Sequence, residues 1–188
     1  MTAKELFIHH LHDARTEHIR WINSIKLLVS GIDIPENQIA LDAISSDFGI
    51  WFYKEAMLFS LGTSRMVLED IEQLFLMLHD KYMKIYPIYY GAKKKPLLAN
   101  FLGAKNKASE YEIELSHRYY EELVVLSDKL KHKLRILESQ LLSLADEKFE
   151  SVAAFTKPRE SVPAMPDLKI PAPANNEEGA YFYGTRGR

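Results

Sequence analysis

Histidine and glutamate side chains are the residues of this chain whose spacing could support metal chemistry. Glu114 and His117 form one Glu-x-x-His motif, but a di-iron carboxylate bundle needs two such motifs and two further glutamates. A hemerythrin-like site needs a second ligand four residues after a histidine, and neither His18 nor His79 is followed by one at that spacing. Both di-iron interpretations are therefore rejected.

Three further histidines cluster near the amino terminus, at positions 9, 10 and 12. On a helix, His9 and His12 share a face that points away from the apolar side. We expect them to be solvated, although an exposed pair at this spacing can collect adventitious metal.

Motifs of enzyme chemistry are missing from the sequence. It has no glycine-rich phosphate loop, no His-Glu-x-x-His and no Gly-x-Ser-x-Gly. It also has no cysteine, which excludes disulfides, thiolate metal ligands and thiol redox chemistry. We therefore expect a protein that is not an enzyme.

Three short motifs occur in order in the first half of the chain. They are His18-Ile-Arg-Trp21, then Ser46-Asp-Phe-Gly49-Ile-Trp51, then a helical stretch ending in Phe75-Leu-Met-Leu-His79. Together they resemble the chemoreceptor zinc-binding (CZB) domain family. The pattern of that family is His-x-x-Trp, then Cys-x-aliphatic-Gly-x-Trp, then a helix with His-x-x-aliphatic-His.

The resemblance implies a zinc site in which some of the ligands have been replaced. In the family, three histidines and one cysteine close a tetrahedral site inside a small helical bundle. Here the implied metal ligands are His18 and His79, whereas Ser46 replaces the cysteine and Phe75 replaces a histidine. Asp47 is a candidate third ligand, because zinc accepts carboxylates. We expect either weakly bound zinc or two buried, hydrogen-bonded histidines left from a lost site.

The first helix is predicted from a capping box and an apolar stripe. Thr2 followed by Glu5 marks its start, and Gly31 and Pro35 end the pattern. The stripe recurs every three or four residues: Phe7, Leu11, Ala14, His18, Trp21, Ile25 and Leu28. The sequence therefore places His18 on the buried side of this helix.

Three more helices are predicted, over residues 37–61, 66–86 and 110–148. Pro87 ends the helix over 66–86. A short helix over 97–102 is predicted in the segment between that helix and the last one. Gly49 inside a helix costs about 1 kcal/mol relative to alanine, which indicates close approach of another backbone or of the Trp21 or Trp51 ring. The predicted fold is all-α, an antiparallel four-helix bundle over residues 1–150.

The last predicted helix is on the order of 55 Å long, against about 35–40 Å for the first and third. Its leucine stripe would therefore extend beyond the bundle. This excess predicts a homodimer that forms through the segment Leu130 to Leu144.

Composition restricts the partners and the location. A formal net charge of -2 gives no basic face for nucleic acid. No apolar run approaches the length of a membrane span, and the start lacks the apolar core of a secretory signal. We therefore expect a cytoplasmic protein with no membrane insertion.

The residues 151–188 are rich in proline and polar side chains, which predicts a disordered tail. This tail carries three consecutive aromatics, Tyr181, Phe182 and Tyr183, which are predicted either to bind a partner or to dock on the protein's own surface.

Two functional interpretations follow. By resemblance, the chain is a non-catalytic bacterial signalling module of the CZB type in which zinc binding is weakened or lost. Relatives in that family sense zinc or oxidants, and the implied partner is a chemotaxis or cyclic-dinucleotide signalling protein. The oxidant sensing of the family cannot operate here, because the cysteine is absent. The alternative is an interaction adaptor that recruits a partner through its aromatic tail.

Overall fold

The computed structural model describes residues 1–60, 62–91 and 108–156. Within these ranges every regular element is helical, which confirms the all-α class for this part of the chain. The elements are α1 (Ala3–Val29), η1 (Glu36–Gln38), α2 (Asp47–Lys54), η2 (Ala56–Phe59), α3 (Arg65–Tyr90), α4 (Glu110–Ser143) and α5 (Asp146–Thr156). The short helix predicted over 97–102 and most of the predicted tail lie outside the described residues.

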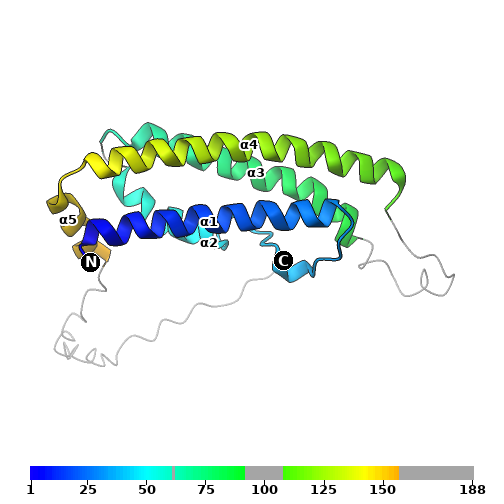
Figure 1. Ribbon diagram of the computed structural model, residues 1–188, viewed down its shortest axis with the longest axis horizontal. Helices are drawn as coiled ribbons and strands as arrows, with labels where there is room; N and C mark the ends of the chain where they lie inside the picture. Colours follow the sequence, from blue (N-terminus) through cyan, green and yellow to red (C-terminus); the bar gives the residue numbers. More distant parts are fainter. Residues whose placement is uncertain (61, 92–107, 157–188) are drawn as a thin grey trace, which may run out of the picture. The chain divides into compact units, whose positions relative to one another are not determined.

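Three long helices form the frame of the fold (Figure 1). Helices α1 and α3 run in the same direction, and α4 runs antiparallel to both and packs against each of them. The short helix α2 packs against α1 and leads through η2 to α3. This arrangement places α1, α2 and α3 around one buried space.

The second helix differs most from the sequence prediction. Instead of one helix over 37–61, the chain forms two short 3-10 turns and the eight-residue α2. A Cβ atom on Gly49 would lie 2.1 Å from the carbonyl oxygen of Ala43, so the chain folds closely over the start of α2. The close approach at Gly49 is therefore made by the preceding backbone and not by Trp21 or Trp51. The expected four-helix bundle lacks a full-length second helix.

The predicted start of α1 is confirmed, whereas the predicted end of α3 is wrong. The predicted capping box at α1 is present, because the Thr2 hydroxyl accepts from the Glu5 amide and the Glu5 carboxylate accepts from the Thr2 amide. Helix α3, however, continues past Pro87 to Tyr90. A proline in the last turn removes only one helical hydrogen bond. The Tyr90 hydroxyl also donates to the carbonyl of Ile34 at 2.9 Å and fixes that turn to the loop after α1.

The predicted last helix is divided in two. Helix α4 ends at Ser143, and the carbonyl of Leu144 accepts a hydrogen bond from Lys4 Nζ at 2.7 Å. The chain then turns back, and α5 packs against α1. Phe149 of α5 is fully buried beside the rings of Phe7 and Phe59. The helical part therefore extends to Thr156, beyond the predicted boundary at residue 150.

The leucine stripe of α4 does not form the predicted dimer surface. Its members have exposed fractions of 3% or less within the single chain: Leu130, Leu134, Leu137 and Leu141. Helices α1 and α3 cover this stripe, and α5 folds back where the stripe was expected to outrun them. The basis of the homodimer prediction is therefore wrong, although the oligomeric state itself remains a prediction.

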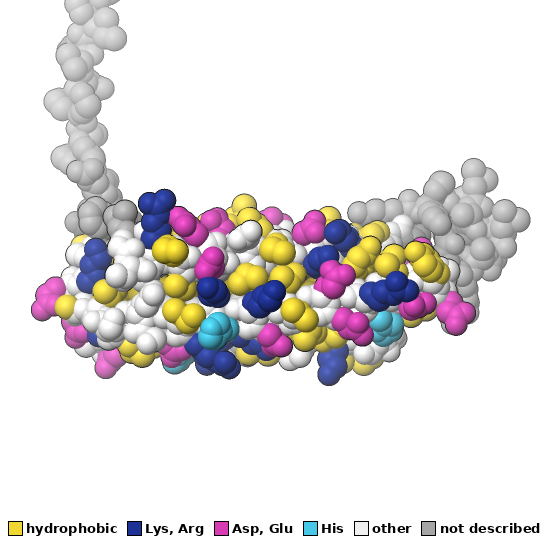
Figure 2. Space-filling view, turned by 90° about the horizontal axis from the view of Figure 1, so that it is seen from above, with side chains coloured by type: hydrophobic (Ala, Val, Ile, Leu, Met, Phe, Trp, Pro, Cys, Tyr) yellow, Lys and Arg dark blue, Asp and Glu magenta, His cyan; other side chains and the backbone are white. Residues whose placement is uncertain are grey.

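The surface shows charges of both signs. The face in Figure 2 carries lysine and arginine side chains interspersed with aspartate and glutamate, and apolar side chains are scattered among them. Among the described helices, none combines the length and the apolar character needed to cross a bilayer.

Candidate functional site

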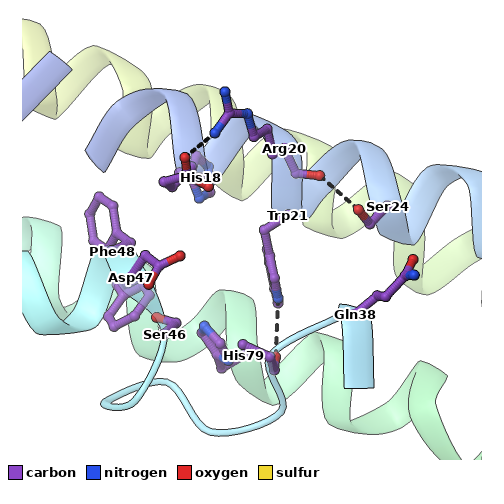
Figure 3. A pocket seen from close by; sticks show the side chains of 12 residues that line it. His18, Arg20, Trp21, Ser24, Gln38, Ser46, Asp47, Phe48 and His79 are labelled. Carbon is purple, nitrogen blue, oxygen red and sulfur yellow. Dashed lines mark hydrogen bonds and ion pairs between the residues drawn. The ribbon is translucent and has the colours of Figure 1, made fainter. Parts of the chain in front are cut away.

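A cavity of about 270 Å³ opens between α1, α3, α2 and the loop that precedes α2. Its lining includes the four positions that the CZB resemblance selects, His18, Ser46, Phe75 and His79, and also Asp47, the candidate third ligand. The remaining lining residues are Glu17, Arg20, Trp21, Ser24, Gln38, Ala40 and Phe48. The fold thus brings residues from three distant segments into one site (Figure 3).

His18 projects from α1 into the core and is 2% exposed. Its Nε2 atom lies 2.9 Å from the hydroxyl oxygen of Ser127 on α4. Burial lowers the pKa of His18 to about 4, and the charges of Lys131 and His79 act in the same direction. The ring is therefore neutral at pH 7, the form in which an imidazole nitrogen can accept a hydrogen bond or bind a metal.

His79 enters the cavity from α3 and is 6% exposed. Burial lowers its pKa to about 4, while a hydrogen bond with the backbone of Leu41 and the charge of Asp42 oppose that effect. Its Nδ1 atom has no hydrogen-bond partner among the described residues. A buried polar atom without a partner costs about 1–3 kcal/mol, so this nitrogen is an unusual feature for a core that serves stability alone.

Trp21 forms one side of the cavity. Its Nε1 donates a hydrogen bond to the carbonyl of Ala40 at 3.1 Å and so ties the loop before α2 to α1. Figure 3 shows Trp21 on the opposite side of the opening from Asp47 and Phe48. The tryptophan of the His-x-x-Trp motif therefore shapes the cavity through its ring and its N–H group.

Ser46 acts as the N-cap of α2. Its hydroxyl accepts a hydrogen bond from the Gly49 amide at 3.1 Å and donates one to the Ala43 carbonyl at 2.7 Å. Capping of this kind satisfies a backbone donor at the helix start. At the position where the family carries a cysteine, the side chain thus has a structural role in holding α2 and the loop.

Phe75 lies in the core and is 2% exposed. Its ring centroid is 4.7 Å from that of Phe48 and 4.9 Å from that of His79. The aromatic side chain therefore occupies space beside His79 where the family would place a second imidazole.

These residues do not fit a complete zinc site. Asp47 is an exposed residue at the mouth of the cavity, in the first turn of α2. Within the described ranges, no three histidine, cysteine or acidic side chains are grouped so that they could hold a metal ion. Two neutral imidazoles facing one cavity are fewer ligands than the four of a structural zinc site.

Two of the three amino-terminal histidines have partners outside α1, whereas His9 pairs with Asp13 on the same helix. His12 lies 2.7 Å from a carboxylate oxygen of Glu138 on α4, and His10 lies 2.7 Å from one of Glu55. The His12 side chain is 44% exposed, as expected for a solvated residue, but it also links α1 to α4. His9 remains 62% exposed. Tyr181, Phe182 and Tyr183 lie outside the described residues.

The partner of His18 was missed by the sequence reasoning. Ser127 is a polar residue, 3% exposed, between the buried leucines of α4. A hydroxyl within an apolar stripe signals a buried hydrogen bond. That signal was present in the sequence, although it does not identify the histidine that the serine meets.

Comparisons of the chain with protein-family models, with curated proteins and with solved structures give no match. The resemblance to the CZB pattern therefore rests on the motifs and on the cavity residues described above.

Proposed function

We propose that this chain is a non-catalytic cytoplasmic signalling or sensory module of the CZB type, in which zinc binding is weakened or lost. One observation supports the proposal above the others. Positions 18, 46, 75 and 79, which are far apart in sequence and correspond to the four family ligands, all line one cavity. Such convergence is what a divergent member of the family should retain.

The chemistry of the cavity supports the degenerate form of the site. Ser46 caps α2, Phe75 fills space, and the two remaining ligand positions are buried neutral imidazoles. On this proposal the bundle is of the four-helix type with a shortened second helix. Its partner is a chemotaxis or cyclic-dinucleotide signalling protein.

Zinc content tests the degenerate site directly. Protein purified without a histidine tag should contain little zinc, and any zinc that it binds should depend on His18 and His79. We expect uptake to vanish in the variant that combines His18→Ala with His79→Ala. Near-stoichiometric zinc in that double variant would contradict the assignment of these two ligands.

Rebuilding the site tests the family assignment. Ser46→Cys with Phe75→His restores the four ligand types of the family pattern and should give tight zinc binding with a zinc-dependent rise in melting temperature. The matched control is Ser45→Cys with Phe75→His, in which the thiol is one position away. A folded first variant that fails to bind zinc, or binds no better than the control, would refute the assignment.

A further inference from the structure

The cavity carries an excess of negative charge at its mouth. Its lining has three side chains that are charged at neutral pH, namely Glu17, Arg20 and Asp47. Glu17 forms an ion pair with Arg20. The carboxylate of Asp47 has no ion-pair or hydrogen-bond partner among the described residues, and Figure 3 shows it directed across the opening toward Trp21. One carboxylate is therefore left for a ligand.

Aromatic rings form the deeper wall of the same cavity. Trp21, Phe48 and Phe75 line it together with the two histidines. The buried Nδ1 of His79 has no hydrogen-bond partner among the described residues. Aromatic rings near a carboxylate are the surroundings that favour organic cations.

A second depression continues the acidic surface along α1 and α2. It shares Glu17 and Asp47 with the cavity and adds the carboxylates of Asp13 and Glu55. Its only other titratable lining residue is His10, which pairs with Glu55. Asp13 pairs with His9, Glu55 with His10 and Glu17 with Arg20. Asp47 is therefore the carboxylate of this surface that remains without a basic partner among the described residues.

We propose that this cavity binds a small organic ammonium ion, with its charge at Asp47 and its alkyl groups against Trp21 and Phe48. The volume of about 270 Å³ lies below that of a pocket for a drug-sized ligand, so the ligand is compact. Binding of the ammonium ion does not depend on the proposed sensory function. The role of the bound compound as a signal does rest on that proposed function.

The test uses choline and its uncharged isostere in which carbon replaces the nitrogen. Each is titrated into the full-length chain in the presence of a chelator, and the nuclear magnetic resonance signals of the Trp21 indole N–H and the Asp47 amide are followed. We expect saturable shifts with choline and binding of the isostere weaker by about tenfold, because only choline gains cation–π and carboxylate attraction. No saturable shift with choline, or equal binding of the isostere, would overturn the proposal.

Asp47→Asn removes the charge and keeps the size of the side chain. It should weaken choline binding by about three- to tenfold, as expected for one partly exposed ion pair. Asp33→Asn makes the same chemical change at an exposed residue outside the cavity and should leave binding unchanged. Equal choline affinity in Asp47→Asn and the unmodified chain would also overturn the proposal.

The chelator separates this test from that of the proposed function. Choline binding in its presence does not depend on zinc, so a failed zinc reconstruction leaves the expected result unchanged. Conversely, a successful reconstruction together with no choline binding would retain the CZB assignment and remove the organic cation as its ligand.

Discussion

The imidazole of His79 stacks on the indole of Trp21, with ring centroids 4.6 Å apart and planes inclined by 27°. This pair joins α1 and α3 across the buried space, and the same indole holds the loop before α2 through Ala40. Aromatic contact and hydrogen bonding therefore connect the three segments that a metal ion would connect in the family pattern. A fold held in this way should keep its stability when metal is removed by a chelator.

Gly49 should be intolerant of any side chain. The β-carbon of Gly49→Ala would meet the Ala43 carbonyl oxygen at 2.1 Å and that of Ile44 at 2.9 Å, so the loop must move. We expect a loss of more than about 2 kcal/mol in the free energy of unfolding, measured by urea denaturation. Gly91→Ala is the matched control, since its β-carbon would lie at an ordinary 3.5 Å from Pro87. Similar losses in both variants would contradict the close packing at Gly49.

Phe75 should contribute strongly to the core. Phe75→Ala removes a ring that is 2% exposed and contacts Phe48 and His79, which should cost about 3–5 kcal/mol. Leu76→Ala, on the same helix at 46% exposure, should change stability by less than about 0.5 kcal/mol. Thermal and urea unfolding of the pair measure the difference. A cost near that of the control would show that Phe75 does not fill the ligand position.

The two buried histidines should make the fold sensitive to mild acid. Their pKa values are about 4 in the folded chain and 6.5 when unperturbed, so only the unfolded chain takes up these protons between those values. The contribution of these two groups to stability is therefore constant well above pH 6.5 and falls as the pH drops toward 4, by up to roughly 3 kcal/mol for each histidine.

Urea unfolding at several pH values, with a chelator present, measures this slope. His79→Phe should reduce the slope between pH 6.5 and 4, whereas His117→Gln, at an exposed position, should leave it unchanged. A slope that is the same in all three proteins would show that the buried imidazoles do not cause the acid sensitivity.

Local signals in the sequence were sufficient for the starts of α1, α3 and α4 and for the buried face of α1. The Thr2 and Glu5 side chains predict a cap that needs only neighbouring residues, and the stripe of α1 correctly places His18 inside. In α3, an apolar residue every three or four positions predicts that Phe75 is buried, and His79 lies one turn later on the same buried face. These features depend on contacts within one helix or on one apolar face.

Contacts between distant residues account for the rest. The length of α2 depends on backbone from Ala43 packing over Gly49, and the break after α4 involves a hydrogen bond from Lys4 at the other end of the chain. Neither contact changes the apolar period, so a pattern of leucines alone predicts one continuous helix. The motifs select several residues that line the cavity, but its shape and its mouth, which combines Glu17 of α1 with Asp47 of α2, depend on packing between distant segments.

Helix α5 should be part of the folded unit, and the residues that follow it should not. Phe149→Ala exposes the space between Phe7 and Phe59 and should cost about 3–5 kcal/mol. A chain that ends at Thr156 should keep the melting temperature of the full chain and lose any partner bound through Tyr181 to Tyr183. A chain that ends at Ser143 should melt lower, because the rings of Phe7 and Phe59 lose their cover. If truncation at Thr156 already lowers the melting temperature, the aromatic segment docks on the helices, and the adaptor alternative loses its main support.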